Sequence, residues 1–399
     1  MKHPQENSPQ PNGSPAPVFP LASTMLLVGV FFMTFVSRTI LSPLLLPIEN
    51  ELGISHAEGG SFFLIISIGL MTSMLLSGWF LQRLTHHQMI TIAVFLSGAA
   101  LLLLAVSEGL LLFRVALFFI GAGAGLYLPS GMTTLTDVVP SGQWGRAIAL
   151  HELGPIFGLA AAPFFAELAL DYADWRSLLV LLGIVSLIAG LIFARFAGGG
   201  RFNGTPPQWS ELNVIIRKRQ FWIIAFFFVM ALGLEMGVYS MLPTYLVEAR
   251  GIDQSAGNTM VSTSRLTSLL MIFIAGWLSD HIGYKKVIGG IALASGLVTA
   301  MFGFTEGWIL IVAVYLQPML ISAFFPAGFT ALAGVSTPEH RNLTVSLVIP
   351  LAYLFSAGMI PAVIGRLAER GAFGLGYIAV GLLMASGIVL LPKMSLPGR

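Results

Sequence analysis

Long apolar segments dominate this sequence and constrain its fold more than any other feature. A helix of about 20 apolar residues is long enough to cross a bilayer. Twelve such segments occur, at 21–46, 59–82, 88–106, 109–134, 145–169, 176–196, 220–246, 256–279, 286–304, 307–335, 342–367 and 373–392. Only 10% of the 399 residues are charged, against about 25% in an ordinary soluble domain. The sequence therefore predicts an all-α membrane protein with twelve transmembrane helices.

Lys and Arg residues are distributed unequally between the two sides of this arrangement. Positive residues favour cytoplasmic loops. With a cytoplasmic N-terminus, thirteen of the loop and tail Lys and Arg residues fall on the inner side and four on the outer side, namely Arg176, Arg250, Arg366 and Arg370. We therefore expect a multi-pass protein of the inner (plasma) membrane with both termini in the cytoplasm.

A charged turn that begins with Gly-Trp occurs twice between apolar segments, at 78–87 and 276–286. The related segments 129–135 and 326–332 are separated by nearly the same distance. Repetition at half the chain length is typical of transporters built from parallel repeats. We therefore expect two pseudo-symmetric six-helix bundles. The expected organisation is a disordered tail at 1–18, an N-terminal bundle at 19–197, a cytoplasmic linker at 198–219, a C-terminal bundle at 220–393 and a tail at 394–399.

These motifs resemble those of the major facilitator superfamily over residues 20–395. The turn at 276–286 is similar to the signature Gly-x-x-x-Asp-x-x-Gly-x-basic-basic between helices 8 and 9, and the copy at 78–87 departs from it. Arg114 with the glycines that follow it is similar to the helix 4 motif, and Gly154-Pro155 to the helix 5 motif. The resemblance implies structural or gating roles for Gly78, Arg83, Arg114, Gly154, Pro155, Gly276, Asp280, Gly283 and Lys285.

Residues 38–53 show a weaker similarity to the organic-anion symporters of that superfamily. Those symporters often carry Asp or Asn before the arginine of helix 1, and Gly-Glu-Gly in helix 4. This chain has Ser37 and Gly123-Ala124-Gly125 at these places. Because the helix 4 carboxylate is absent, the resemblance implies that proton coupling takes place elsewhere, at Glu235 or, as second choice, at Glu152.

Five charged residues interrupt the apolar spans: Arg38, Arg114, Glu152, Glu235 and Arg265. Charges inside a membrane are costly and are functional by default. Arg38 and Glu235 occupy nearly equivalent positions in the two repeats, so they are able to face each other across a central cavity. The alternative for Arg38 is that its long side chain extends to the outer interface.

Arg265 lies among Ser and Thr residues, which indicates a hydrated wall. Its guanidinium matches a carboxylate or a phosphate. The alternative is a structural ion pair with Glu235 on the neighbouring helix. Burial would allow Glu235 to bind and release a proton near neutral pH. The sequence thus predicts an anion site at Arg38 and Arg265 and a proton site at Glu235.

His151 and Glu152 form either a second proton site or a structural polar pair. They begin a His-Glu-x-x-His zinc motif, but Pro155 replaces the second histidine, so that interpretation fails. Weaker substrate-binding candidates are Tyr127, Tyr239 and Gln317, for which a packing role is the alternative.

The sequence contains no Gly-x-x-x-x-Gly-Lys-Ser/Thr loop for ATP, so an ion gradient is the expected driving force. We expect a secondary transporter that moves a small organic anion by alternating access in symport with protons. The alternative is a proton-coupled antiporter that exports drugs or other hydrophobic or cationic compounds, although two arginines disfavour a cation. An enzyme is disfavoured because no nucleophile–base set is present. We expect no cofactor, no metal and no nucleic-acid partner; the partners are the bilayer, the substrate and protons, and the protein is expected to be a monomer.

Overall fold

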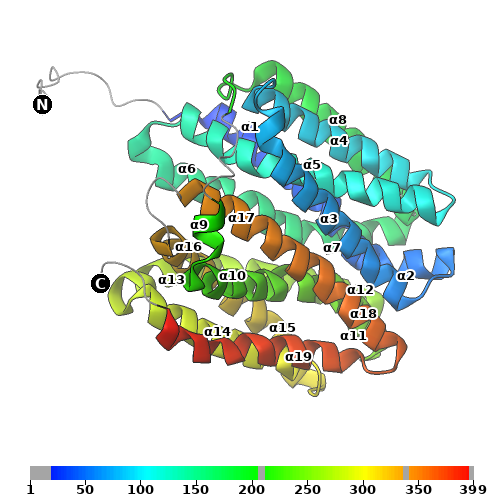
Figure 1. Ribbon diagram of the computed structural model, residues 1–399. Helices are drawn as coiled ribbons and strands as arrows, with labels where there is room; N and C mark the ends of the chain where they lie inside the picture. Colours follow the sequence, from blue (N-terminus) through cyan, green and yellow to red (C-terminus); the bar gives the residue numbers. More distant parts are fainter. Residues whose placement is uncertain (1–18, 205–211, 336–340, 395–399) are drawn as a thin grey trace, which may run out of the picture.

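The computed structural model describes residues 19–204, 212–335 and 341–394, which are almost entirely helical (Figure 1). The first half contains α1 Leu21–Thr39, α2 Leu41–Leu52, α3 His56–Phe80, α4 His86–Ala105, α5 Leu110–Val138, the 3-10 turn η1 Ser141–Gln143, α6 Trp144–His151, α7 Leu153–Tyr172 and α8 Trp175–Phe196. The second half contains α9 Leu212–Ile216, α10 Arg219–Leu232, the π-helix η3 Gly233–Gly237, α11 Val238–Glu248, α12 Gln254–Leu266, α13 Ser268–Ile282, α14 Tyr284–Met301, α15 Gly307–Ser322, α16 Phe324–Val335, α17 Arg341–Tyr353, the π-helix η5 Leu354–Met359, α18 Ile360–Glu369, α19 Phe373–Ser386 and the 3-10 helix η6 Gly387–Lys393.

Ten continuous helical stretches in the described part are long and apolar enough to cross a membrane. They correspond to the predicted spans one to seven and ten to twelve, with ends that differ by only a few residues from the predicted ones. The other two predicted spans are occupied by α12–α13 and α14, which fall outside this set of ten; α12 is polar along its length. The predicted all-helical membrane fold is confirmed.

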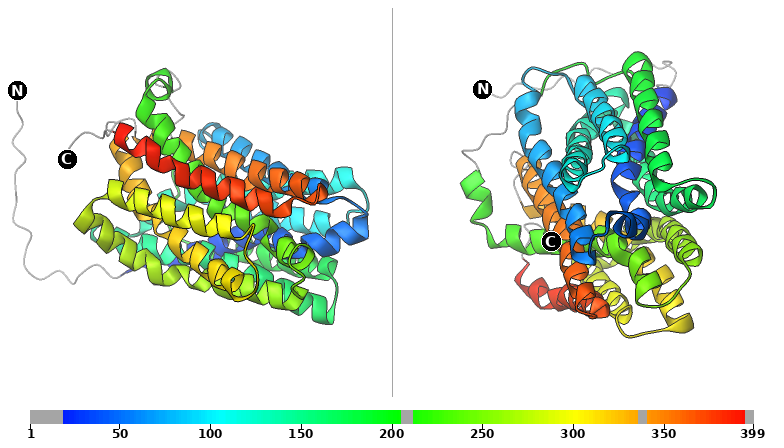
Figure 2. Two further views of the ribbon diagram at one scale, coloured as in Figure 1. Left: turned by 90° about the horizontal axis from the view of Figure 1, so that it is seen from below. Right: turned by 90° about the vertical axis from the view of Figure 1, so that its right-hand side faces the viewer.

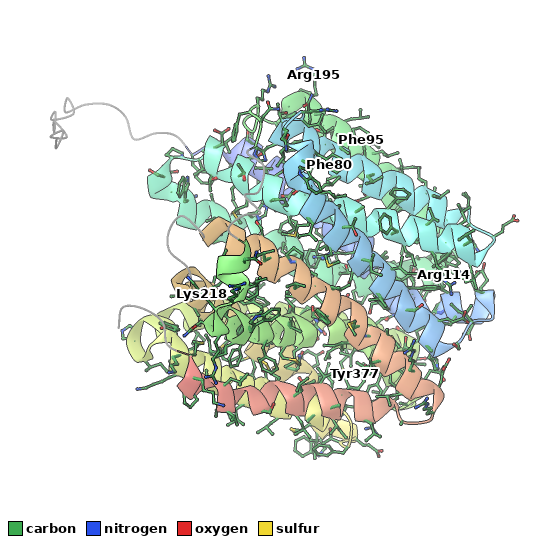
Figure 3. The ribbon with its side chains drawn as sticks, in the orientation of Figure 1. Phe80, Phe95, Arg114, Arg195, Lys218 and Tyr377 are labelled. Carbon is green, nitrogen blue, oxygen red and sulfur yellow. The ribbon has the colours of Figure 1, made fainter. Side chains whose placement is uncertain are left out.

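The two halves of the chain form two helical bundles that lie side by side (Figures 1 and 2). Because each half returns to the side on which it starts, α1 begins and η6 ends at the same end of the molecule, here called the terminal end. The opposite end, with the loops at 53–55, 173–174 and 370–372, is called the distal end. Figure 3 places Arg195 and Lys218 toward the terminal end and Arg114 toward the distal end.

Glycines show the repeat in three dimensions. In the first half a Cβ atom at Gly98 of α4 would lie 3.0 Å from the carbonyl oxygen of Gly183 in α8. In the second half a Cβ atom at Gly296 of α14 would lie 2.5 Å from the carbonyl oxygen of Gly381 in α19. Both members of the second pair are shifted by 198 residues from the first. Small residues allow membrane helices to approach closely, and both halves use the same contact.

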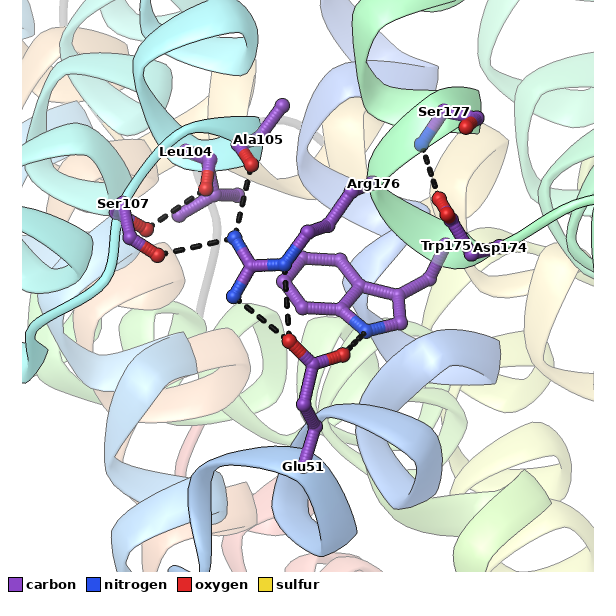
Figure 4. A network of polar contacts seen from close by, with 8 residues as sticks. All are labelled: Glu51, Leu104, Ala105, Ser107, Asp174, Trp175, Arg176 and Ser177. Atoms are coloured by element: carbon purple, nitrogen blue, oxygen red, sulfur yellow. Dashed lines mark hydrogen bonds and ion pairs between the residues drawn. The ribbon is translucent and has the colours of Figure 1, made fainter.

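An arginine ties helix ends together at the distal end of the first half (Figure 4). Arg176 Nη1 donates to the carbonyl oxygens of Ala105 (2.8 Å) and Ser107 (2.9 Å), and its Nε and Nη2 contact Glu51 Oε1 at 2.9 and 2.8 Å. Trp175 Nε1 donates to the other oxygen of Glu51. The cluster therefore joins the ends of α2, α4 and α8.

Asp174 caps α8 beside this cluster: its carboxylate accepts a hydrogen bond of 2.7 Å from the backbone N–H of Ser177, which lowers the pKa of Asp174.

The second half contains an equivalent arginine that joins helix ends. Arg250 Nη2 donates to the carbonyl oxygen of Phe302 (2.9 Å) and Nη1 pairs with Glu306 (3.0 Å). The main-chain acceptors thus come from the distal ends of α4 and α14, which are equivalent helices.

Replacing Arg176 by lysine is expected to destabilise the first half by about 1–2 kcal/mol, because a lysine cannot make the forked contacts to two carbonyls and a carboxylate, while the partly exposed ion pair itself contributes little. The readout is the thermal unfolding midpoint of the purified protein in detergent. Arg195→Lys, at the exposed terminal end, is the control and should leave the midpoint unchanged. A midpoint for Arg176→Lys equal to that of the control would contradict this role.

The halves are joined in the middle and at the distal end. Ser262 Oγ donates to the carbonyl oxygen of Ala160 (2.5 Å), and Asn258 Nδ2 donates to Glu167 Oε2 (3.2 Å), which links α12 to α7. Glu369 of α18 accepts a hydrogen bond from the first turn of α3. The structure is thus held closed on the distal side.

The repeated charged turn is described only in part. Gly276 and Asp280 lie in α13, and their side chains fall outside the described residues. Gly283 precedes α14 with a positive φ of 85°, a conformation that suits glycine. Lys285 Nζ donates to the carbonyl oxygen of Met394 (3.0 Å), so it ties α14 to the end of η6. In the first half, Gly78 lies in the last turns of α3 and Arg83 in the loop that follows.

Candidate functional site

A cavity of about 30 Å³ lies between the two halves, enough for about two water molecules. Residues from both halves surround it. They are Arg38, Thr39, Ser42, Phe63, Ile66, Ser67 and Leu70 from the first half, and Met236, Tyr239, Ser240, Tyr353 and Ala357 from the second. Arg38 is the single charged residue among these lining residues.

Arg38, in the last turn of α1, is 8% exposed. Its Nη2 donates to the hydroxyl of Tyr353 (3.3 Å), across the boundary between the halves. Its guanidinium carbon lies 4.0 Å from the centre of the Phe35 ring and 4.9 Å from that of Tyr353. Two aromatic rings therefore hold the cation by cation–π contacts, while its buried Nε has no hydrogen-bond partner.

The π-helix η3 contributes one residue to the cavity lining. A π-helical turn contains an extra residue and is frequent at functional sites. Met236, which stands 198 residues after Arg38, lines the cavity, and Glu235 does not. Within the described residues no ion pair joins Arg38 to Glu235. The expectation that these two side chains face each other is therefore not met, because Glu235 lies within the second half beside Arg265.

Arg265 is 1% exposed at the end of α12. Its Nη1 lies 3.5 Å from the main-chain carbonyl oxygen of Glu235, and its guanidinium carbon lies 4.7 Å from the centre of the Tyr239 ring. The Nε and Nη2 atoms have no hydrogen-bond partner. A direct ion pair with the carboxylate of Glu235 is not formed, and Glu235 Oε2 is itself buried without a partner.

Tyr239 separates the two arginines. It lines the cavity beside Arg38, and its ring also lies 4.7 Å from the guanidinium carbon of Arg265. Its hydroxyl donates to the carbonyl oxygen of Leu159 (3.0 Å), and its own carbonyl accepts a hydrogen bond from Ser42 (2.9 Å). Both partners belong to the first half, so Tyr239 is fixed at the boundary between the halves.

Gln317 and η5 support the π-helix. Gln317 Nε2 donates to the carbonyl oxygen of Leu234 in η3 (2.9 Å). A Cβ atom at Gly237 would lie 2.6 Å from the carbonyl oxygen of Ser356, so the missing side chain lets η3 and η5 approach closely. Gln317 does not line the cavity; its contact holds the backbone that carries Glu235.

Unpaired positive charge is the main electrostatic feature of this site. In the described part of the chain, no carboxylate oxygen lies within 4.0 Å of the guanidinium of Arg38 or Arg265. Buried cations are normally paired. Three guanidinium nitrogens without a partner therefore make this region suited to binding an anion.

A second polar cluster lies in the first half. The Tyr127 hydroxyl contacts the carbonyl oxygen of Leu27 (3.0 Å) and Nε2 of His151 (2.7 Å). His151 Nδ1 lies 3.6 Å from Glu152 Oε1. Tyr127 does not line the cavity beside Arg38, although it was a candidate for substrate binding. The break between α6 and α7 thus brings Tyr127, His151 and Glu152 together.

Two expected intramembrane charges are exposed. Glu152 is 51% exposed at the break between α6 and α7. Arg114, near the distal end of α5, is 41% exposed and forms an ion pair of 3.5 Å with Glu58. Sequence position alone placed both inside an apolar run, but neither is in fact buried.

Tyr353 is a cavity residue that the sequence did not single out from other tyrosines. Its contact with Arg38 and its place in the cavity lining identify it.

Comparisons with known proteins concern the family and the fold of the whole chain. The family model described as Major Facilitator Superfamily matches residues 27–266 and 236–397. A probable sulfoacetate transporter of Cupriavidus necator is 24% identical, with 91% of each chain covered. The D-galactonate transporter of Escherichia coli is 22% identical over 93% of this chain and 95% of the relative, and a cis,cis-muconate transport protein of Acinetobacter baylyi is 22% identical over 86% of both.

Solved structures show the same fold. The crystal structure of a D-xylose–proton symporter superposes with a TM-score of 0.78 at 12% identity, covering 94% of this chain and 98% of the other. A bacterial homologue of the human lysosomal transporter Spinster, crystallised in an inward-facing and occupied conformation, gives a TM-score of 0.73 at 14% identity and covers 96% of both chains.

Proposed function

Because the chain belongs to the Major Facilitator Superfamily and is a secondary transporter rather than an enzyme, we propose that it carries a small organic anion across the membrane in symport with protons. The observation that carries this proposal is the pair of buried arginines without carboxylate partners at the boundary between the halves. The names of the sulfoacetate, galactonate and muconate relatives support an organic anion as the substrate.

Arg38 and Arg265 take complementary roles in this proposal. Arg38 already lines the cavity and offers its unpaired Nε. Arg265 lies behind the ring of Tyr239, so a movement of that ring would give an anion access to its Nε and Nη2. A guanidinium binds a carboxylate or sulfonate through paired donors. A cationic substrate would meet repulsion at the same place.

Glu235 is the carboxylate that we propose for proton coupling at this site. Its Oε2 is buried without a hydrogen-bond partner, and it lies beside Arg265. An unpaired buried carboxylate is costly when charged, and a bound proton removes that cost. An anion that occupies Arg265 would weaken the attraction between this arginine and Glu235, and so favour proton binding at Glu235.

We further propose that the terminal end faces the cytoplasm. Arg195 and Lys218 lie toward that end (Figure 3), and positive loops favour the cytoplasmic side. The halves are pinned together on the distal side by Asn258 and Ser262. In this orientation the described conformation is closed toward the outside, as alternating access requires of one of its two end states.

Uptake by proteoliposomes tests the proposal. With an inward proton gradient, the wild-type protein should accumulate at least one of D-galactonate, sulfoacetate and cis,cis-muconate. Arg265→Ala should lower this uptake by roughly tenfold or more, because it removes an unpaired cation from the anion site. Glu235→Gln, which cannot release a proton, should lose the stimulation by the gradient while anion exchange continues.

The control is Arg195→Ala, which lies at the terminal end away from the cavity and should transport like the wild type. Unchanged uptake in both Arg265→Ala and Glu235→Gln would refute these roles. Extrusion of a cationic dye without uptake of any of the three anions would refute the symport proposal and favour the drug-export alternative.

A further inference from the structure

We propose that His151 is a second proton-binding site, which exchanges protons with the terminal side through Glu152 and is linked to the anion at Arg38 through Phe31 and Phe35. This inference rests on the proposed function, since it names a further group through which anion and proton binding are linked. Four contacts carry it: those of His151 with Tyr127, with Glu152 and with Phe31, and that of Phe35 with Arg38.

The hydrogen bonds of Tyr127 assign the proton on Nε2 of His151. The carbonyl oxygen of Leu27 is able only to accept, so the Tyr127 hydroxyl donates to it at 3.0 Å. The hydroxyl oxygen then accepts the bond of 2.7 Å from Nε2–H of His151. With Nε2 protonated, Nδ1 is the nitrogen that carries a proton in the cation and lacks one in the neutral ring.

The Nδ1 atom is poised between these two states. His151 is 2% exposed and its Nδ1 has no hydrogen-bond partner in the described structure. The carboxylate of Glu152 lies 3.6 Å away, a separation that a small side-chain movement would close. When Glu152 carries a proton, its O–H bond breaks as the new N–H bond forms at Nδ1, leaving a carboxylate beside an imidazolium.

Glu152 connects this buried nitrogen to the molecular surface. Its side chain is 51% exposed, and it stands at the break between α6 and α7 toward the terminal end. Gly154 lets this break lie close to α1, because a Cβ atom there would be 3.2 Å from the carbonyl oxygen of Val28. The proposed path of protons to His151 therefore starts at the molecular surface toward the terminal end, at the side chain of Glu152.

Aromatic rings of α1 connect His151 to the anion site. His151 stacks on Phe31, Phe31 meets Phe35 edge to face, and Phe35 lies under the guanidinium of Arg38. The successive distances are 4.4, 5.9 and 4.0 Å, so the imidazole lies no more than about 14 Å from the guanidinium carbon. At this separation in a protein interior, two unit charges alter each other's binding by roughly tenfold.

The sign of this interaction favours symport. A proton on His151 adds positive charge near Arg38 and so strengthens the binding of an anion there. By reciprocity, an anion at Arg38 strengthens proton binding at His151 to the same extent. The titratable groups described around His151 are Tyr127 on α5 and Glu152 beside it, and its stacking partner on α1, Phe31, brings no charge.

Proton uptake on anion binding tests the proposal. The purified full-length protein in detergent, in a weakly buffered solution with a pH dye, receives whichever of D-galactonate, sulfoacetate or cis,cis-muconate the wild type transports. The wild type should take up protons, and its affinity should rise roughly tenfold as His151 becomes protonated. His151→Gln should lose the part of the proton uptake that this site provides, and its anion affinity should lose most of its dependence on pH. Tyr127→Phe, which deletes one hydroxyl, should shift the pH dependence of the anion affinity. Glu152→Gln should slow the proton uptake.

His87→Gln is the matched control. His87 is also buried in the first half, stacks on a phenylalanine at 5.0 Å and has an unpaired Nδ1, but its Nε2 contacts a main-chain carbonyl. It should behave like the wild type. Wild-type proton uptake and pH dependence in His151→Gln would overturn the inference and leave the symport proposal standing.

A measurement that needs no anion completes the test. A ¹⁵N-histidine NMR spectrum should contain a titrating signal that is absent in His151→Gln and shifted in Glu152→Gln. Failure to find such a signal would overturn proton binding at His151. Absence of anion binding by the wild type, with this signal present, would refute the proposed function and the coupling but not the proton site.

Discussion

Replacing Arg38 by alanine should lower anion uptake by tens to thousands of fold, equivalent to a loss of about 2–5 kcal/mol of binding free energy. Arg38 is the charged residue of the cavity lining, and its Nε is free to bind an anion. Arg38→Lys should also lose most of the uptake. A lysine keeps the charge, but it lacks the planar fork and the stacking that Phe35 and Tyr353 provide.

The measurement is the initial rate of uptake at several anion concentrations. Arg366→Ala, on an exposed face of α18, is the matched control and should leave the rate unchanged. The Arg38→Ala variant should retain the thermal unfolding midpoint of the wild type, because Arg38 has no carboxylate partner and its removal leaves no buried charge unpaired. Wild-type uptake by a folded Arg38→Ala protein would show that the anion binds elsewhere.

The second large effect is expected from Gly121→Ala, which should destabilise the protein by at least about 1–3 kcal/mol. Gly121 of α5 packs against the main chain of Ile66 in α3, and an added Cβ atom would overlap the carbonyl group and Cα of that residue. Backbone in the middle of a helix is not free to move aside alone. Relief of the overlap would therefore separate α3 from α5, two helices of the first bundle.

Thermal unfolding in detergent and the fraction of monodisperse protein measure this effect. Gly29→Ala is the matched control, since Gly29 lies on an exposed face of α1 with no atom near an added Cβ. It should be neutral or stabilise the helix by up to about 1 kcal/mol. Equal unfolding midpoints for the two variants would contradict the role of the close contact.

The architecture was predictable because it depends on properties that the sequence carries directly. Segment length and apolar composition determine which parts cross a membrane, and the ends of the helices agree with those predictions within a few residues. The two Gly-Trp turns are 198 residues apart. The same spacing separates Gly98 from Gly296 and Gly183 from Gly381, so the two halves repeat one glycine contact between helices.

The site was less predictable because it depends on local departures from regular helix. The offset of 198 residues places Arg38 opposite position 236, and Glu235 was paired with Arg38 only because it stands one residue away. In the structure Met236 lines the cavity and Glu235 does not. Similarly, exposure of Glu152 follows from the break between α6 and α7, which an apolar run conceals.

The small size of the cavity has a consequence for measured affinities. A volume of about 30 Å³ is far below the roughly 300 Å³ or more of a typical ligand pocket, so the described conformation excludes a bound organic acid. Binding must then select a wider conformation, and the observed dissociation constant equals the intrinsic one divided by the population of that conformation. If the wider form makes up about 1% of the molecules, the observed affinity is about a hundredfold weaker than the intrinsic one. Side chains that touch no substrate, such as Asn258 and Glu167 at the distal contact, thereby set how tightly the transporter binds its substrate.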